Sequence, residues 1–367
     1  MNEFSFLERL RQLTASRKHS SRVIDGIGDD ASVIRQLSGR DLIVTADLLV
    51  EDVDFYLPAT PARLLGHKAL AVSLSDIAAM GARPLWAFLS IGLPRERWES
   101  SFKDEFYEGF LALADHFGVT LSGGDVSETK DRLVIDSIVL GETAAGAAVK
   151  RSGAQAGDQI YVTGNLGGAA AGVKLIELGA RVRSPTVREG PSANTDPSTS
   201  SDHADSHSDE EAIQSLLLRQ LRPQPRVGWG IVLGEQQLAS AMIDLSDGLS
   251  SDLNHLCKES GAGATIAAAA IPLDEDVQRL CGRRALDPLA LALHGGEDFE
   301  LLFTVRPENV GRLPKRVDGI AITQIGEITD SPGVRVSEKG HVWDLKPGGF
   351  EHFQTASRAS QSLEPPA

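Results

Sequence analysis

The chain has 367 residues, enough for two domains of ordinary size with separate cores. Its formal net charge of −15 argues against nucleic acid and anionic membrane surfaces as partners. The two cysteines, Cys257 and Cys281, favour neither a disulfide framework nor a cysteine metal site. Because no signal-peptide or membrane-span pattern is found, we expect a cytoplasmic protein that binds no membrane.

Residues 1–149 are expected to form the first domain. Helical and strand-like stretches alternate in it, and two of the helices end at glycines, Gly81 and Gly118. This alternation predicts an α/β (α+β) fold with helices packed on a sheet. The predicted helices cover about 1–20, 63–80 and 98–117, and the predicted strands 42–55, 84–94, 119–126 and 132–143.

Residues 150–353 are expected to form a second α/β domain, followed by a tail over 354–367. Ser, Asp, Pro and Thr dominate residues 184–212, so this segment is predicted to be a disordered surface loop. His203 and His207 are interpreted as part of that solvated loop and not as metal ligands. Predicted strands lie near 156–164, 242–248, 301–305 and 321–328, and predicted helices over 167–179, from 213 and up to 260.

Acidic residues recur beside Gly or Ser at the predicted turns and strand ends. Each one alone fits a turn or a helix cap. Several of them, however, follow apolar runs, where α/β folds place ligand sites, and carboxylate oxygens suit Mg²⁺. A set this dense needs cations to neutralise it. The segments are Gly28–Asp30, Thr45–Asp47, Ser75–Asp76, Gly123–Asp125, Asp244–Gly248 and Gly295–Asp298.

The local signatures of the common nucleotide sites are missing from the sequence. It contains no GxxxxGK[ST] loop, no protein-kinase HRD and DFG pair, and no GxGxxG after a strand. The glycine-rich stretch Gly164–Gly172 fits a phosphate loop and close helix packing equally well. The residues therefore favour metal ions held by scattered aspartates over a lysine-containing phosphate loop.

Seven segments occur in the order found in thiamine-monophosphate kinases, which belong to the superfamily of aminoimidazole-ribonucleotide synthetases. They are GIGDDASVI, TADLLVEDVDF, GHKALAVSLSDIAAMGARP, LSGGDVSET, KRSGAQAGDQIYVTGNLGGAAAG, IDLSDGLSSDLNHL and GGEDFELLFTV. The resemblance runs from about Phe4 to Phe353 and is interrupted only by the Ser/Asp-rich loop. It implies a phosphotransferase that moves the γ-phosphoryl group of ATP onto the phosphate of thiamine monophosphate. It also implies that the N-terminal domain, residues 1–149, binds ATP and Mg²⁺ and pairs with that of a second copy in a homodimer.

The resemblance further implies a set of site residues. No catalytic Ser, Cys or His is required, because the phosphate nucleophile is already ionised and needs chiefly positioning and charge cancellation. The implied ligands of several Mg²⁺ ions are Asp30, Thr45, Ala46, Asp47, Asp76, Asp125, Asp244 and Asp247. The implied ATP contacts are Tyr107, Gly124, Asp125, Arg151 and Ser246, and the implied substrate contacts are Asp54, Glu297 and Phe350.

Two positions depart from the family pattern. Asp54 stands where the family usually has a substrate-contacting His, which indicates either an altered affinity or a shifted substrate. Ala46 replaces a common Thr, although its backbone carbonyl can still bind a metal. Two alternatives therefore stay open: another ATP-using member of the superfamily with a different phosphate acceptor, or a non-catalytic nucleotide-binding paralogue. No Cys precedes Cys257, which argues against a selenophosphate synthetase.

Overall fold

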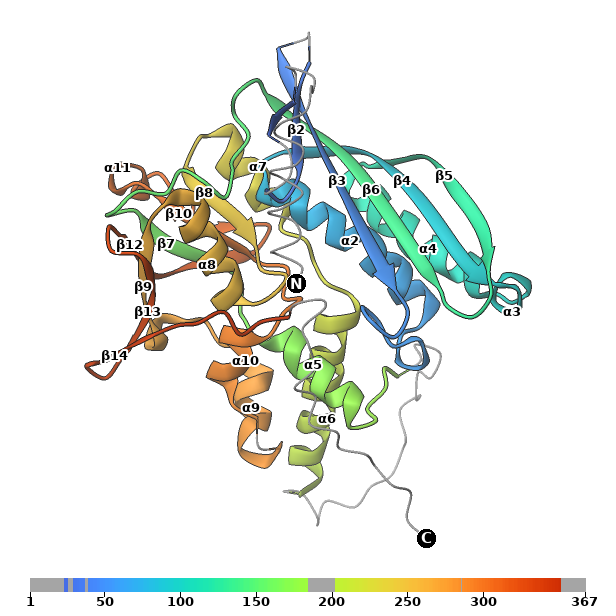
Figure 1. The fold of residues 1–367 in the computed structure, drawn as a ribbon. Coiled ribbons are helices and arrows are strands. Elements are labelled where there is room, and N and C mark those ends of the chain that lie inside the picture. Colours follow the sequence, from blue (N-terminus) through green and yellow to red (C-terminus); the bar gives the residue numbers. More distant parts are fainter. Residues whose placement is uncertain (1–22, 26–28, 37–38, 184–201, 285, 351–367) are drawn as a thin grey trace.

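A computed structural model shows two β-sheets, each accompanied by helices, and confirms the predicted α/β (α+β) class (Figure 1). The structure describes residues 23–25, 29–36, 39–183, 202–284 and 286–350. The predicted helix over about residues 1–20 and the predicted tail lie outside these residues. None of the described helices has the length and the hydropathy that a membrane span requires.

The first sheet has six strands in the order β1-β2-β3-β6-β4-β5, so that β5 lies at an edge. Its pairs are antiparallel except for β4 with β5. The strands are β1 (Val23–Asp25), β2 (Ser32–Arg35), β3 (Arg40–Val50), β4 (Arg83–Pro94), β5 (Thr120–Thr129) and β6 (Val134–Ala144).

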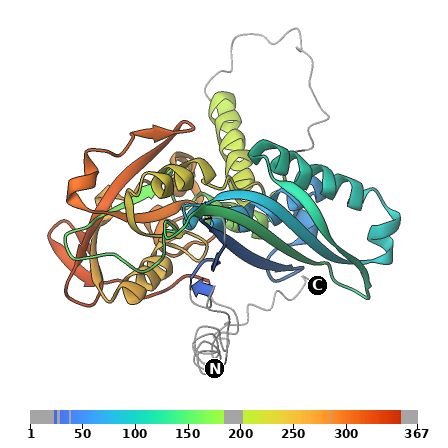
Figure 2. The ribbon, with the colours of Figure 1, turned by 90° about the horizontal axis from the view of Figure 1, so that it is seen from above.

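Two long helices, α2 (Ala62–Ala79) and α4 (Phe102–Phe117), lie on one side of this sheet (Figure 2). They cross closely, because a Cβ atom at Gly66 would lie 1.8 Å from the carbonyl oxygen of Phe106. Nearly every residue of α2 is buried, so this helix is the central element of the core. Two short elements complete this half, η1 (Leu57–Ala59) and α3 (Arg95–Glu99).

The second sheet has eight strands, seven of them in the order β14-β13-β9-β12-β7-β10-β8, while β11 pairs with β12. Strand β10, which lies between β7 and β8, is buried along its whole length. The strands are β7 (Gln159–Thr163), β8 (Ala239–Asp244), β9 (Gly263–Ala267), β10 (Leu301–Val305), β11 (Arg316–Val317), β12 (Ile320–Thr329), β13 (Gly333–Glu338) and β14 (His341–Asp344).

Helices surround the second sheet and also connect it to the first. One buried cluster of apolar residues runs from α2 through Trp229 to Tyr161 and Phe303, so the two halves share part of their core. The boundaries at 149/150 and 353/354 stay a prediction. The helices are α5 (Gly168–Glu177), α6 (Asp202–Leu221), α7 (Val227–Glu235), α8 (Leu249–Ser260), η2 (Ala268–Ala270), α9 (Glu275–Arg284), α10 (Pro288–His294) and α11 (Pro307–Val310).

The expected disordered loop over 184–212 is partly wrong. Helix α6 begins at Asp202, so residues 202–212, with His203 and His207, are helical. Residues 184–201 lie outside the described residues. The buried Ala212, Leu216 and Leu217 anchor the second half of α6 to the core. The composition that indicated disorder is therefore also that of a polar first half of an amphipathic helix.

Candidate functional site

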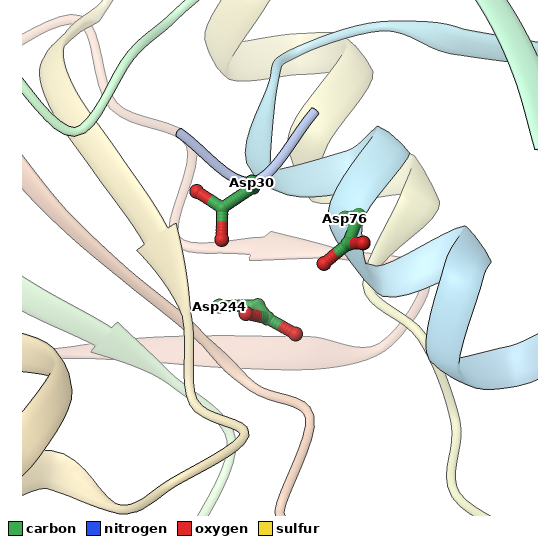
Figure 3. Close-up of side chains that lie close together, drawn as sticks. All are labelled: Asp30, Asp76 and Asp244. Carbon is green, nitrogen blue, oxygen red and sulfur yellow. The ribbon is translucent and has the colours of Figure 1, made fainter. Parts of the chain in front are cut away.

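Three carboxylates that are far apart in the sequence meet where the first half of the chain faces the second. Asp30 lies just before β2, Asp76 in the last turn of α2, and Asp244 at the end of β8. One oxygen from each lies within 4.8 Å of the others, and the side chains point toward one another (Figure 3). Three hard oxygen donors on three separate elements form a candidate site for a divalent cation.

Hydroxyl groups orient these carboxylates and a fourth, Asp47. Ser73 and Ser75 on α2 donate to Asp47 Oδ2 and Asp244 Oδ2, both at 2.7 Å. Thr45 on β3 donates to Asp76 Oδ2. Helix α2 thus supplies one carboxylate of the cluster and holds two others through serines, which explains the polar residues in this otherwise apolar helix.

The acidic cluster strongly perturbs the protonation of its members. Burial raises the pKa of Asp244 to about 8, and the nearby Asp30 carboxylate adds to this effect. Burial, together with Asp47 and Asp244, likewise raises the pKa of Asp76 well above its usual value. Burial raises the pKa of Asp47 to about 6. These buried carboxylates repel one another when they are ionised. A bound cation would neutralise them and remove this repulsion, so the cluster is well suited to hold a metal ion.

Arg151 lies beside the cluster. Its guanidinium makes a two-point contact with Asp30, with Nε at 3.0 Å from Oδ2 and Nη2 at 2.7 Å from Oδ1. Burial is the largest effect and opposes the charged form, but the carboxylates of Asp30, Asp29 and Asp244 together offset it and raise the pKa of Arg151. The Arg151 backbone amide also donates to Asp29 Oδ2 at 3.2 Å. An arginine already held at the rim of an acidic site can meet an incoming phosphate there.

A cavity of about 990 Å³ lies next to the cluster. Several of the predicted site residues line this one cavity, although they come from four different segments of the sequence. Asp47, the fourth carboxylate of the acidic cluster, also lines this cavity. The other predicted residues in the lining are Asp54, Ser246, Asp247, Glu297 and Phe350.

Asp54, the residue that departs from the family pattern, has a structural contact of its own. Its Oδ2 accepts a hydrogen bond from the backbone amide of Val50 at 2.7 Å, which closes the turn after β3. The residue is partly buried and lines the cavity. One carboxylate oxygen therefore helps to shape the cavity wall.

Phe350 reaches the cavity on a glycine-rich segment that is fixed to α8. The backbone amides of Gly348 and Gly349 donate to Ser250 Oγ and Ser251 Oγ at 3.2 and 3.1 Å. The Phe350 amide donates to the carbonyl of Asp247 at 3.2 Å. The ring is half-exposed, with 50% of the residue surface accessible, which leaves a face for a flat ligand.

Three further side chains that contact the predicted site residues carry no sequence signal of the kind used above. Asp252 is buried, and its Oδ2 accepts hydrogen bonds from the backbone amides of Asp247 at 3.2 Å and Gly248 at 3.0 Å. Lys68 is buried and its Nζ lies 2.7 Å from Glu297 Oε1. Gln220 donates its amide to the other oxygen of Glu297. A lysine within the apolar run HKALAVSL is the one hint that the sequence offers.

Two of the predicted nucleotide residues, Gly124 and Asp125, lie apart from the acidic cluster, and the third, Tyr107, is on α4. Gly124 and Asp125 are on the edge strand β5, and Asp125 pairs with Ser90 of β4 and is exposed. No other residue fits at Gly124, because an added Cβ would lie 1.8 Å from the Leu89 carbonyl oxygen. Three strand spacings separate β5 from β3, about 14 Å, so one ion cannot bind Asp47 and Asp125 of the same chain.

The remaining predicted residue, Ala46, lies on β3 with its side chain exposed, between the inward-facing Thr45 and Asp47. Its side chain offers no donor atom to a metal. Binding of a metal by Ala46 through its backbone carbonyl stays a prediction.

Comparisons with known proteins agree along nearly the whole chain. The family models for the N-terminal and C-terminal domains of AIR synthase related proteins match residues 28–143 and 155–339. Thiamine-monophosphate kinase of Salmonella typhimurium is 37% identical over 96% of this chain and 98% of its own. The Bacillus subtilis enzyme of the same name is 34% identical over 96% and 100%.

Solved structures give the same result. The structure of AaThiL complexed with AMPPCP and TMP matches with a TM-score of 0.78 and 29% identity, covering 96% of this chain and 97% of that one. Thiamine-monophosphate kinase from Stenotrophomonas maltophilia K279a matches with a TM-score of 0.69 and 36% identity, over 92% and 98%.

Proposed function

Because this chain belongs to the thiamine-monophosphate kinase family, within the AIR synthase related proteins, we propose that its acidic cluster holds Mg²⁺ for phosphoryl transfer. The chain is an ATP-dependent kinase that phosphorylates thiamine monophosphate to thiamine diphosphate. The observation that supports the Mg²⁺ proposal best is the convergence of Asp30, Asp76 and Asp244 beside the large cavity.

The donor set fits Mg²⁺, which binds a few carboxylates and leaves its other positions to water and phosphate oxygens. Mg²⁺ bound there would cancel charge on the two reacting phosphate groups and keep them in line. The chain itself supplies the fixed carboxylates, with Thr45, Ser73 and Ser75 holding their orientation. Asp47, Asp247 and the backbone of Ala46 would complete the metal sites.

Arg151 would hold a phosphate of ATP. Its present partner, Asp30, is one of the proposed metal ligands, so a cation that neutralises Asp30 also frees the guanidinium for phosphate. Ser246, the other predicted ATP contact on this part of the chain, lines the cavity. Tyr107 and the backbone at Gly124 on β5 would contact the nucleoside end. No general base is needed, because the attacking phosphate oxygen of thiamine monophosphate is ionised near neutral pH.

We further propose a homodimer. The sheet face away from α2 and α4 carries apolar side chains in the open, among them Leu48 and Trp86 with 59% and 43% of their surfaces exposed. Phe88 joins them on the same strand as Trp86, whereas its neighbours Ala87 and Leu89 are buried against the helices. An exposed apolar sheet face next to an unpaired edge strand is usually buried against another surface. The same face of a second copy of this chain would bury it.

The two free cysteines and the use of ATP are in keeping with the cytoplasm as the proposed location.

The activity is tested with purified protein, ATP, Mg²⁺ and thiamine monophosphate. Thiamine diphosphate and ADP are expected in equal amounts, and unphosphorylated thiamine should give no product. A protein that circular dichroism shows to be folded, and that still forms no thiamine diphosphate, would contradict the assignment. Activity with a different phosphate acceptor in place of thiamine monophosphate would instead support the other superfamily member considered above.

A further inference from the structure

An oxygen in the cavity wall lacks a hydrogen-bond partner. Among the described residues, two buried side-chain polar atoms make no hydrogen bond, Ser137 Oγ and Gln220 Oε1. Gln220 lines the cavity and only 6% of its surface is exposed, while Ser137 is not part of the lining. Buried polar groups are nearly always paired, so an unpaired carbonyl oxygen at a ligand cavity indicates a donor that the chain does not supply.

The orientation of this amide is fixed by its neighbours. The nitrogen of Gln220 donates to Glu297 Oε2, and Lys68 Nζ lies 2.7 Å from Glu297 Oε1. A carboxylate can only accept, so the amide nitrogen must face Glu297 and the carbonyl oxygen must face away from it. The Glu297 backbone is held in turn, because its amide donates to the Ser246 carbonyl at 2.8 Å.

These three side chains come from three separate elements. Lys68 is on α2, Gln220 is near the end of α6, and Glu297 lies in the loop before β10 with a φ of 64°. Only 1% of the Lys68 side chain is exposed, so its ammonium has little access to solvent and pairs with Glu297. Such a chain of contacts is rigid enough to present one acceptor atom at a defined place.

The substrate offers a single group that matches this acceptor. In thiamine monophosphate, the exocyclic amino group of the aminopyrimidine ring is the only N–H donor, since the ring nitrogens accept and the thiazolium has no N–H. We propose that Gln220 determines specificity by accepting a hydrogen bond from this amino group, and that Lys68 positions it through Glu297. This inference rests on the proposed function.

The test compares two substrates, thiamine monophosphate and its analogue with hydrogen in place of the amino group. The natural protein should prefer thiamine monophosphate by roughly tenfold to a hundredfold in kcat/KM, because the analogue leaves the acceptor unpaired. Gln220→Leu, which has a similar volume and no acceptor, should lose this preference through a higher KM for thiamine monophosphate. Its KM for ATP should stay unchanged.

Lys68→Met should also weaken the preference, and Lys68→Arg should restore part of it, because the arginine can still pair with Glu297. Gln214→Leu is the matched control: it lies on the same helix, outside the cavity lining, and should keep the natural preference. Thermal melts verify that each variant is folded, and Gln220→Met serves if the leucine variant does not fold.

The outcomes separate this inference from the function on which it rests. If the natural protein forms no thiamine diphosphate, the proposed function fails. If the natural protein is active and Gln220→Leu keeps its preference for the amino-bearing substrate, the inference is overturned, and the oxygen binds water or nothing.

Discussion

Asp244 illustrates how a single buried carboxyl group makes stability depend on pH. Its pKa is about 8 in the folded protein, mainly because of burial, against an ordinary value of 3.8. Between these values the folded state holds more protons than the unfolded chain, so stability falls as the pH rises. The metal-free protein should therefore be less stable at pH 8 than at pH 6.

Asp244→Asn removes this ionisation and keeps an oxygen for the hydroxyl of Ser75. We expect it to raise the melting temperature of the metal-free protein at pH 8 by about 2–4 °C, with a smaller effect at pH 5. Thermal melts in the presence of a chelator measure both values. An equal change at the two pH values would show that the charge of Asp244 does not set the stability.

Asp54 should act mainly through the turn that it closes. Asp54→Asn keeps an acceptor for the Val50 amide and should change kcat and the KM for thiamine monophosphate by less than about threefold. Asp54→Ala leaves that amide without its partner, so the turn should loosen and the KM should rise by about tenfold. Steady-state kinetics of both variants decide this, and an equal loss in the two would show that the negative charge itself matters.

At the scale of the element, α2 carries the crossing with α4 as well as the acidic cluster. Gly66→Ala places a methyl group against the Phe106 carbonyl and should lower the free energy of unfolding by about 2 kcal/mol or more. Gly118→Ala is the control, since it meets no atom within 4 Å and only imposes a left-handed φ of 68°, at about 1 kcal/mol. Urea unfolding measures both, and an equal effect would contradict the close crossing.

The elements of the fold were largely predictable because hydrophobic periodicity and glycine stops are local signals. The predicted helix over 63–80 and the predicted strand over 84–94 match α2 and β4 within a residue. The beginning of α6 was not predictable in this way, since its first half is polar and only its second half is anchored in the core. Composition alone does not separate a polar helical turn from a loop.

The acidic residues of the site were predictable as candidates because they occur in short segments with Gly or Ser, several of which follow an apolar run. Their meeting was not, because it depends on how α2, β8 and the segment before β2 are packed. Lys68 and Gln220 were missed for a related reason: their partner Glu297 lies more than 70 residues away from either. The roles of the site residues remain predictions.

At the scale of the whole molecule, the distance between Asp125 and the acidic cluster has a consequence for the dimer. Asp125 projects from the edge strand, about 14 Å from β3 of its own chain. If it binds the same ions as Asp47, it must come from the partner copy. Each active site would then contain residues of both chains.

A mixed dimer tests this. Asp76→Asn and Asp125→Asn should each be inactive as homodimers. The purified heterodimer, with one chain of each, should regain roughly half of the natural activity, because one of its two sites is then fully intact. A heterodimer that stays inactive would show that both residues act within one chain.

The most direct test of the central claim is the rate of thiamine diphosphate formation as a function of Mg²⁺ concentration, for the natural protein and for Asp76→Asn. Asp76→Asn replaces one carboxylate of the cluster by a neutral group of the same shape. The account predicts that the variant is folded and loses at least about a hundredfold in rate at saturating ATP, with a higher Mg²⁺ requirement. A variant with more than half of the natural rate at the same Mg²⁺ concentration would contradict it.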